Sequence, residues 1–138
     1  MKILALMLAV FSLSVAQIAA SKEEDSAIPK VEYINLQPPF VANFDDGESR
    51  SRLSYVKADI ALRVSTTTAK TAVEYHAPYL RHELVMLLSK QDMATMTTNE
   101  GKERLRAEAL EKVKAVLQQE EGQPMVEDLL FSTFVIQR

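Results

Sequence analysis

Apolar and polar residues alternate along residues 55–64, which is the pattern of a β-strand with one buried face and one wet face. Such a strand suits an antiparallel sheet that helices cover on one side only. The apolar face carries Val56, Ala58, Ile60, Leu62 and Val64. The opposite face carries Tyr55, Lys57, Asp59, Ala61 and Arg63.

Two further segments have the composition of extended chain. Residues 31–44 are apolar at intervals, but Pro38 and Pro39 cannot donate to a ladder, so this segment predicts an edge strand or two short extended pieces. Residues 125–137 are rich in Leu, Phe, Val and Ile. They predict a long last strand that is buried on both sides and lies away from the sheet edge.

Between these strands the apolar period becomes helical. Residues 69–91 predict one helix, with Pro78 inside it as the site of a kink or a restart. Residues 100–119 predict a second helix, with Thr97 and Glu100 as a capping box and residues 121–124 as its end. The order strand, strand, helix, helix, strand predicts an α+β fold. We expect a small antiparallel or mixed sheet of about three strands, with two helices on one face.

The first twenty residues form a separate unit. Lys2 is followed by an apolar stretch over residues 3–20, which is typical of a secretory signal with cleavage after Ala16 or Ala20. The alternative is a retained anchor in the inner membrane, since eighteen helical residues rise about 27 Å. Both interpretations place the rest outside the cytoplasm. Residues 21–30 are polar and predict a linker, and residues 31–138 form the exported domain.

Composition argues against most kinds of chemistry. The chain has no Cys, which excludes thiolate metal sites and thiol catalysis, and its three Gly cannot form a phosphate-binding loop. Its net charge of −3 and lack of a basic block disfavour nucleic-acid binding. His76 and His82 are six residues apart and fall on opposite sides of a straight helix. We therefore expect no catalytic residues, no metal site, no cofactor and no nucleic-acid partner.

Five segments carry a family resemblance when they are taken in order: residues 35–43 (NLQPPFVAN), 55–62 (YVKADIAL), 84–90 (LVMLLSK), 98–106 (TNEGKERLR) and 126–137 (VEDLLFSTFVIQ). Together they resemble the flagellar basal body-associated FliL family. The resemblance covers roughly residues 31–138, and its specificity comes from the ordered set of segments, which includes the terminal FSTFVIQ. It implies a periplasmic domain with a stomatin/prohibitin-like fold, from single-pass inner-membrane proteins of the flagellum.

The resemblance also implies a function. The periplasmic domains of the family can form rings around the torque-generating stator units, and its members support motility under load. We therefore expect a non-enzymatic accessory of the basal body that binds stator or basal-body proteins and self-associates, with a ring as one form. The alternative is a soluble periplasmic binding module of the same fold without a motor role. The candidate interface is the polar face of the alternating strand: Tyr55, Lys57, Asp59 and Arg63.

Overall fold

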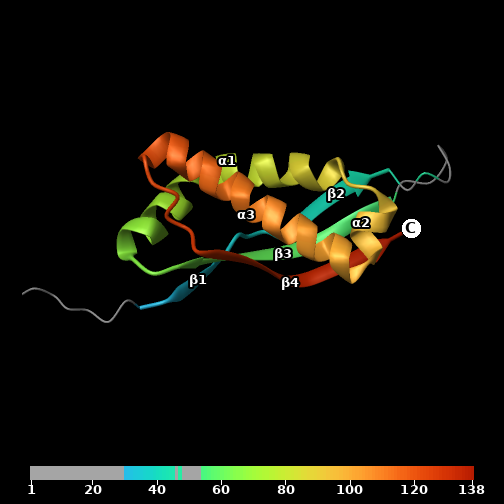
Figure 1. Ribbon diagram of the computed structural model, residues 1–138, viewed down its shortest axis with the longest axis horizontal. Coiled ribbons are helices and arrows are strands. Elements are labelled where there is room, and N and C mark those ends of the chain that lie inside the picture. Colours follow the sequence, from blue (N-terminus) through green and yellow to red (C-terminus); the bar gives the residue numbers. More distant parts are fainter. Residues whose placement is uncertain (1–29, 46, 48–53) are drawn as a thin grey trace, which may run out of the picture.

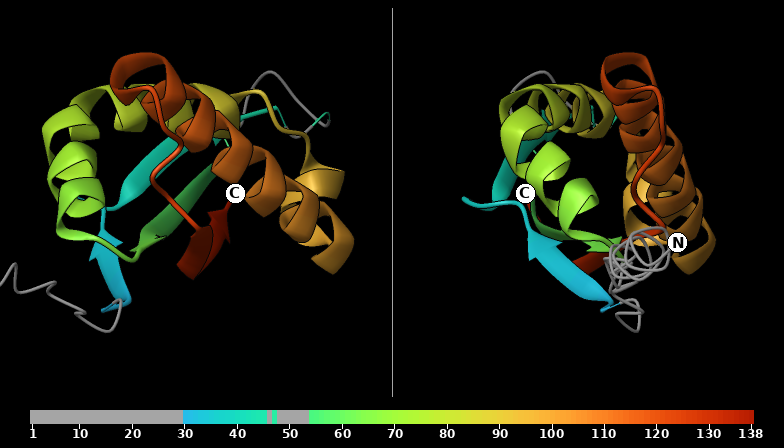
Figure 2. Two further views of the ribbon diagram at one scale, coloured as in Figure 1. Left: turned by 60° about the vertical axis from the view of Figure 1, so that its left-hand side comes forward. Right: turned by 90° about the vertical axis from the view of Figure 1, so that its left-hand side faces the viewer.

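A computed structural model describes residues 30–45, 47 and 54–138 of the chain. It contains one sheet and a helical layer that covers one face of that sheet (Figures 1 and 2). The elements in chain order are β1 (Glu32–Asn35), β2 (Phe40–Phe44), β3 (Ser54–Val64), α1 (Thr67–Ser89), α2 (Met93–Thr97), α3 (Asn99–Glu121) and β4 (Asp128–Gln137). The predicted α+β class is confirmed, and the described residues add a fourth strand and the short helix α2.

Strand β3 is the centre of the sheet, and every strand pairing is antiparallel. β1 pairs with the second half of β3 and β2 pairs with its first half, so both lie along the same edge. Pro38 and Pro39 fall between these two short strands, as their missing amide donors require. The Leu36 amide still donates to the Ile60 carbonyl at 2.9 Å, which continues the ladder toward the break.

Helix α1 begins at Thr67, two residues before the predicted start at residue 69. The Thr66 hydroxyl accepts a hydrogen bond from the Ala69 amide at 3.0 Å and caps the helix. Pro78 lies within the helix, and the two halves of α1 run in different directions (Figure 1). The bend lets both halves follow the sheet, so Val73 before it and Leu80 after it are fully buried.

The N-cap of helix α3 lies one residue after the Thr97 that the sequence predicted. Thr98, not Thr97, is the N-cap, and its hydroxyl accepts from the Gly101 amide at 3.0 Å. Thr97 is instead the last residue of α2, where its hydroxyl donates to the Met93 carbonyl. α3 ends at Gly122, whose φ of 75° is the left-handed conformation that glycine adopts without strain.

The core lies between the sheet and the helices. The alternation predicted for β3 is confirmed, except that Ala61 is also buried, at 5% exposure, although it lies on the polar face. The apolar stripes of α1 and α3 face the sheet as predicted. The largest side chains below 2% exposure include Phe40, Ile60, Leu62, Leu80, Leu84, Leu88, Met96, Leu105, Leu117 and Leu129.

The prediction that the last strand avoids the edge was wrong. β4 pairs with β3, and no other described strand lies beyond it, so β4 forms the second edge of the sheet. Its two-sided apolar pattern has another cause: one side packs on the helical layer, while Leu130 and Val135 are 37% and 43% exposed. Composition alone does not separate a central strand from an edge strand whose outer side chains are apolar.

The predictions for residues 1–20, with the cleavage candidates Ala16 and Ala20, lie outside the described residues, as does nearly all of the 21–30 linker. Among the described residues, no helix combines the length and the hydropathy that a membrane crossing needs.

Candidate functional site

The four candidate interface residues lie together on the side of β3 that faces away from the helices. Lys57 is exposed, and Tyr55, Asp59 and Arg63 are half-buried. Their alternation with fully buried Val56, Ala58 and Ile60 assigns them to this side. Figure 2 shows that α1 and α3 cover the opposite side of the sheet. β3 therefore presents a mixed row of one aromatic and three charged side chains on the uncovered side.

The neighbouring strands add apolar side chains to this row, which the sequence did not reveal. Val41 of β2 and Val135 of β4 flank Lys57, while Tyr33 of β1 lies opposite Arg63. Residues directly opposite in an antiparallel pair share a face, so these side chains join the candidate residues. We call this surface the open face, and it comprises Tyr33, Val41, Tyr55, Lys57, Asp59, Arg63, Leu130 and Val135.

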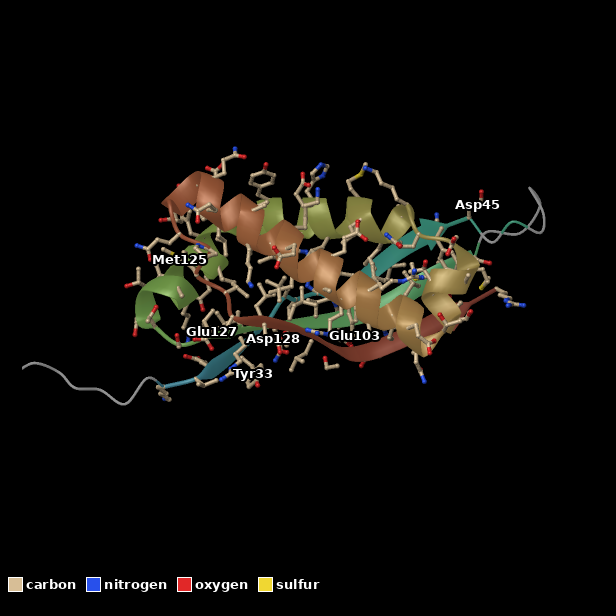
Figure 3. All side chains as sticks on the ribbon, viewed as in Figure 1. Tyr33, Asp45, Glu103, Met125, Glu127 and Asp128 are labelled. Atoms are coloured by element: carbon tan, nitrogen blue, oxygen red, sulfur yellow. The ribbon has the colours of Figure 1, made fainter. Side chains whose placement is uncertain are left out.

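The open face is apolar as well as charged. Val41 is 58% exposed and Tyr33 is 51% exposed, so more than half of each of these side chains is in contact with solvent. Figure 3 shows Tyr33 on the side of the sheet away from the helical layer. Only the pairing register reveals this arrangement, because Tyr33 and Arg63 are thirty residues apart in the chain.

The charges of the open face are only partly neutralised. The Arg63 Nε atom lies 3.3 Å from Glu127 Oε2, and although both side chains are about 40% exposed, this nitrogen is itself buried and makes no hydrogen bond to the described residues. The Tyr55 hydroxyl donates to the Gln137 side-chain oxygen. Within the part of the chain that the structure describes, neither Lys57 nor Asp59 is in an ion pair. Both remain available to a charged partner.

A second charged cluster joins α3 to β4 at the other edge of the sheet. The Arg106 guanidinium donates to both Glu103 oxygens at 2.9–3.0 Å and to Asp128 at 2.6 Å. It also donates to the Leu129 carbonyl at 3.2 Å. Hydrogen bonding to Arg106 lowers the pKa of Glu103, and Glu103 raises the pKa of Arg106. This cluster fixes the start of β4 against α3 (Figure 3).

The histidines are not arranged as metal ligands. The His76 Nε2 atom lies 2.6 Å from Glu121 Oε1, which connects α1 to the end of α3, and His82 is exposed on α1. Among the described residues, no group of three or more His, Asp or Glu side chains is placed to hold a metal ion.

The comparisons with known proteins agree with the resemblance found in the sequence. Residues 33–137 match the model of the flagellar basal body-associated protein FliL family. The flagellar protein FliL of Aquifex aeolicus is 29% identical over 102 residues, which are 74% of this chain and 59% of that protein. The flagellar protein FliL of Escherichia coli K12 is 28% identical over 121 residues, 87% of this chain and 75% of that protein. The match extends from β1 to the end of β4, and the chain therefore belongs to the FliL family of flagellar basal body-associated proteins.

Proposed function

We propose that this chain is a non-enzymatic accessory of the flagellar basal body. In this proposal it acts in the periplasm, either secreted or anchored in the inner membrane through residues 3–20. It binds a stator or basal-body protein and supports motility. Family membership favours the location, and the open face is the observation that favours a binding role.

The chemistry of the open face suits a reversible protein contact. Val41 and Val135 flank Lys57, and Tyr33 lies opposite Arg63, so a partner would bury apolar surface while pairing the two charges. Exposed apolar patches with a polar surround are typical of protein-binding surfaces. The same face would serve self-association, including ring formation, or a motor protein as partner.

Reversing the two cations of the open face tests this proposal. Lys57→Glu with Arg63→Glu should leave the fold intact, since neither side chain is in the core. It should weaken association, or localisation to the motor, because it places like charges in the contact. Circular dichroism of the purified chain measures the fold, and sedimentation measures its association. Swimming in soft agar by a complemented deletion strain measures its effect on motility.

A matched control carries the same change of net charge on the helical layer. Lys90→Glu with Arg104→Glu alters two exposed side chains at the end of α1 and on α3. We expect this variant to associate and swim as the wild type does. An intact open-face variant with wild-type association and motility would contradict the proposal. Lost association with unchanged swimming would instead favour a periplasmic binding module without a motor role.

A further inference from the structure

The outer edge of β4 is a second exposed surface, which meets the open face at Leu130. The Leu129 amide donates to its neighbour Asp128 at 2.8 Å, and its carbonyl accepts from Arg106. Both groups therefore point away from β3. Asp128 and Arg106 satisfy the outward amide and carbonyl of Leu129. They do not reach the outward groups of the residues that follow.

The pairing register shows which other backbone groups point outward. Thr133, Val135 and Gln137 lie opposite Asp59, Lys57 and Tyr55. The Arg63 carbonyl accepts a hydrogen bond from the Glu127 amide, so Arg63 and every second residue before it in β3 direct their amides and carbonyls toward β4. Before the register shift, Leu130 and Asp128 lie opposite Ala61 and Arg63 in the same way. The β4 residues that alternate with these inward partners direct their amides and carbonyls to the free edge. Besides Leu129, these residues are Phe131, before the register shift, and Phe134 and Ile136 after it.

A groove of about 290 Å³ runs beside this edge, between β4 and the first turns of α3. Phe131 and Phe134 form its apolar wall, with ring centroids 5.1 Å apart. Asn99, Lys102, Glu103 and Arg106 of α3 line the other side, where Glu103 is paired with Arg106 and not with Lys102. The Lys102 ammonium lies 5.7 Å from the centre of the Phe134 ring and is in no ion pair with the residues that the structure describes.

Among the described residues, the opposite edge of the sheet offers no equivalent surface. Pro38 and Pro39 interrupt it, and Arg81 of α1 donates to the carbonyls of Leu36 and Pro38. A strand that approached this edge would find two short segments rather than one ladder. The β4 edge, by contrast, combines outward backbone groups, two aromatic rings and an unpaired cation.

We propose that the β4 edge and its groove bind an extended peptide segment of another protein by strand addition. The segment would pair with the outward groups of Phe131, Phe134 and Ile136. It would place apolar side chains against the two rings and a carboxylate on Lys102. A peptide that alternates apolar residues with at least one Asp or Glu has this chemistry.

Charge separates this occupant from a second copy of the chain. If two β4 strands paired along this stretch, residues 131–136 would face the same residues, FSTFVI, which contain no carboxylate. Asp128 lies before this stretch and is already hydrogen-bonded to Arg106. A second β4 would therefore leave Lys102 without a counter-ion, whereas an acidic peptide supplies one.

Selection from a displayed library of random peptides, each of about nine residues so as to span the edge, tests the proposal. The full chain is the bait, with Lys102→Glu and Arg104→Glu as parallel baits. Arg104 is an exposed cation of the same helix outside the groove, so its reversal is the control. We expect enriched peptides to alternate apolar and acidic residues and to bind the wild type and Arg104→Glu equally. Lys102→Glu should weaken them about tenfold.

Two measurements on an enriched synthetic peptide locate the contact. N-methylation of a peptide amide that faces β4 should weaken binding about tenfold, because it removes a backbone hydrogen bond and adds bulk. The amide resonances of Phe131, Phe134 and Ile136 should shift on titration. Absence of alternating acidic peptides, or shifts confined to the open face, would overturn the proposal. Concentration-dependent shifts of the β4 amides without peptide would also overturn it, by assigning the edge to a second copy.

Discussion

Gly101 is the position where helix propensity and packing predict opposite effects of one methyl group. It lies in the first turn of α3, and alanine there is favoured over glycine by about 0.8–1 kcal/mol on propensity alone. A Cβ at this position, however, would lie 2.6 Å from the Thr95 Cα and 2.7 Å from the Thr98 hydroxyl, and closer still to the Thr95 carbonyl oxygen. Two of these atoms belong to the backbone of α2 and cannot rotate away.

The expected net effect of Gly101→Ala is a loss of stability. Relief of the contact requires α2 to move from α3, and overpacking of this kind costs about 1–3 kcal/mol. The same movement strains the Thr98 cap, worth about 1 kcal/mol, which offsets the gain in propensity. We therefore expect the free energy of unfolding to fall by about 1–3 kcal/mol, as measured by urea unfolding followed by circular dichroism.

Two further variants separate packing from capping. Thr98→Ala alone should cost about 1 kcal/mol, the contribution of the cap. Gly101→Ala in the Thr98→Ala background should still be destabilising, since the Thr95 backbone atoms remain in the way. A midpoint for Gly101→Ala at or above that of the wild type would show that α2 adapts freely, and would refute the argument.

Two other predictions concern β3 and the α2 cap. Ile60→Ala should cost about 2–5 kcal/mol because Ile60 is 1% exposed in the core, while Arg63→Ala should change the free energy of unfolding by no more than about 1 kcal/mol. If urea unfolding showed the same loss of unfolding free energy for both variants, the assignment of Ile60 to the buried face and Arg63 to the exposed face would be contradicted. Asp92 caps α2 by accepting from the Thr95 amide at 2.7 Å, which lowers its pKa below the ordinary 3.8. A lowered folded-state pKa contributes stability above the ordinary value that is lost as pH falls through the folded value. Asp92→Asn should therefore make the free energy of unfolding depend less on pH below about pH 4, as measured by thermal unfolding at a series of pH values. An unchanged pH dependence in this range would show that Asp92 does not contribute to the acid sensitivity of the fold.

Local patterns in the sequence predicted the elements because each pattern depends on one element alone. The alternation over residues 55–64 identified β3 and its buried face, and the helical stripes identified the inner sides of α1 and α3. The cap of α3 was displaced by one residue because Thr97 and Thr98 are chemically similar. The short helix α2, which the sequence did not predict, includes Thr97 as its last residue, so Thr98 is the residue that caps α3.

Properties that depend on pairing could not be predicted in this way. Ala61 is buried on the polar face because its small side chain lies between Asn35 and Leu130 of the neighbouring strands. The open face likewise depends on the register that places Tyr33 opposite Arg63. The groove beside β4 depends on the placement of α3. No spacing within one segment encodes these contacts, so the candidate site was found only in part.

The two exposed surfaces of the sheet differ in the groups they offer a partner, and this difference makes them separable by mutation. The open face presents side chains of β3 and of the strands beside it, so a partner bound there would contact Lys57, Val41 and Val135. The β4 edge presents backbone groups, with Lys102 as the main side-chain determinant. Because β3 lies between the open face and the helical layer, reversal of Lys57 should leave the α3–β4 groove unchanged. If both surfaces are used, Lys57→Glu and Lys102→Glu should have additive effects on association, as expected for sites without shared partners.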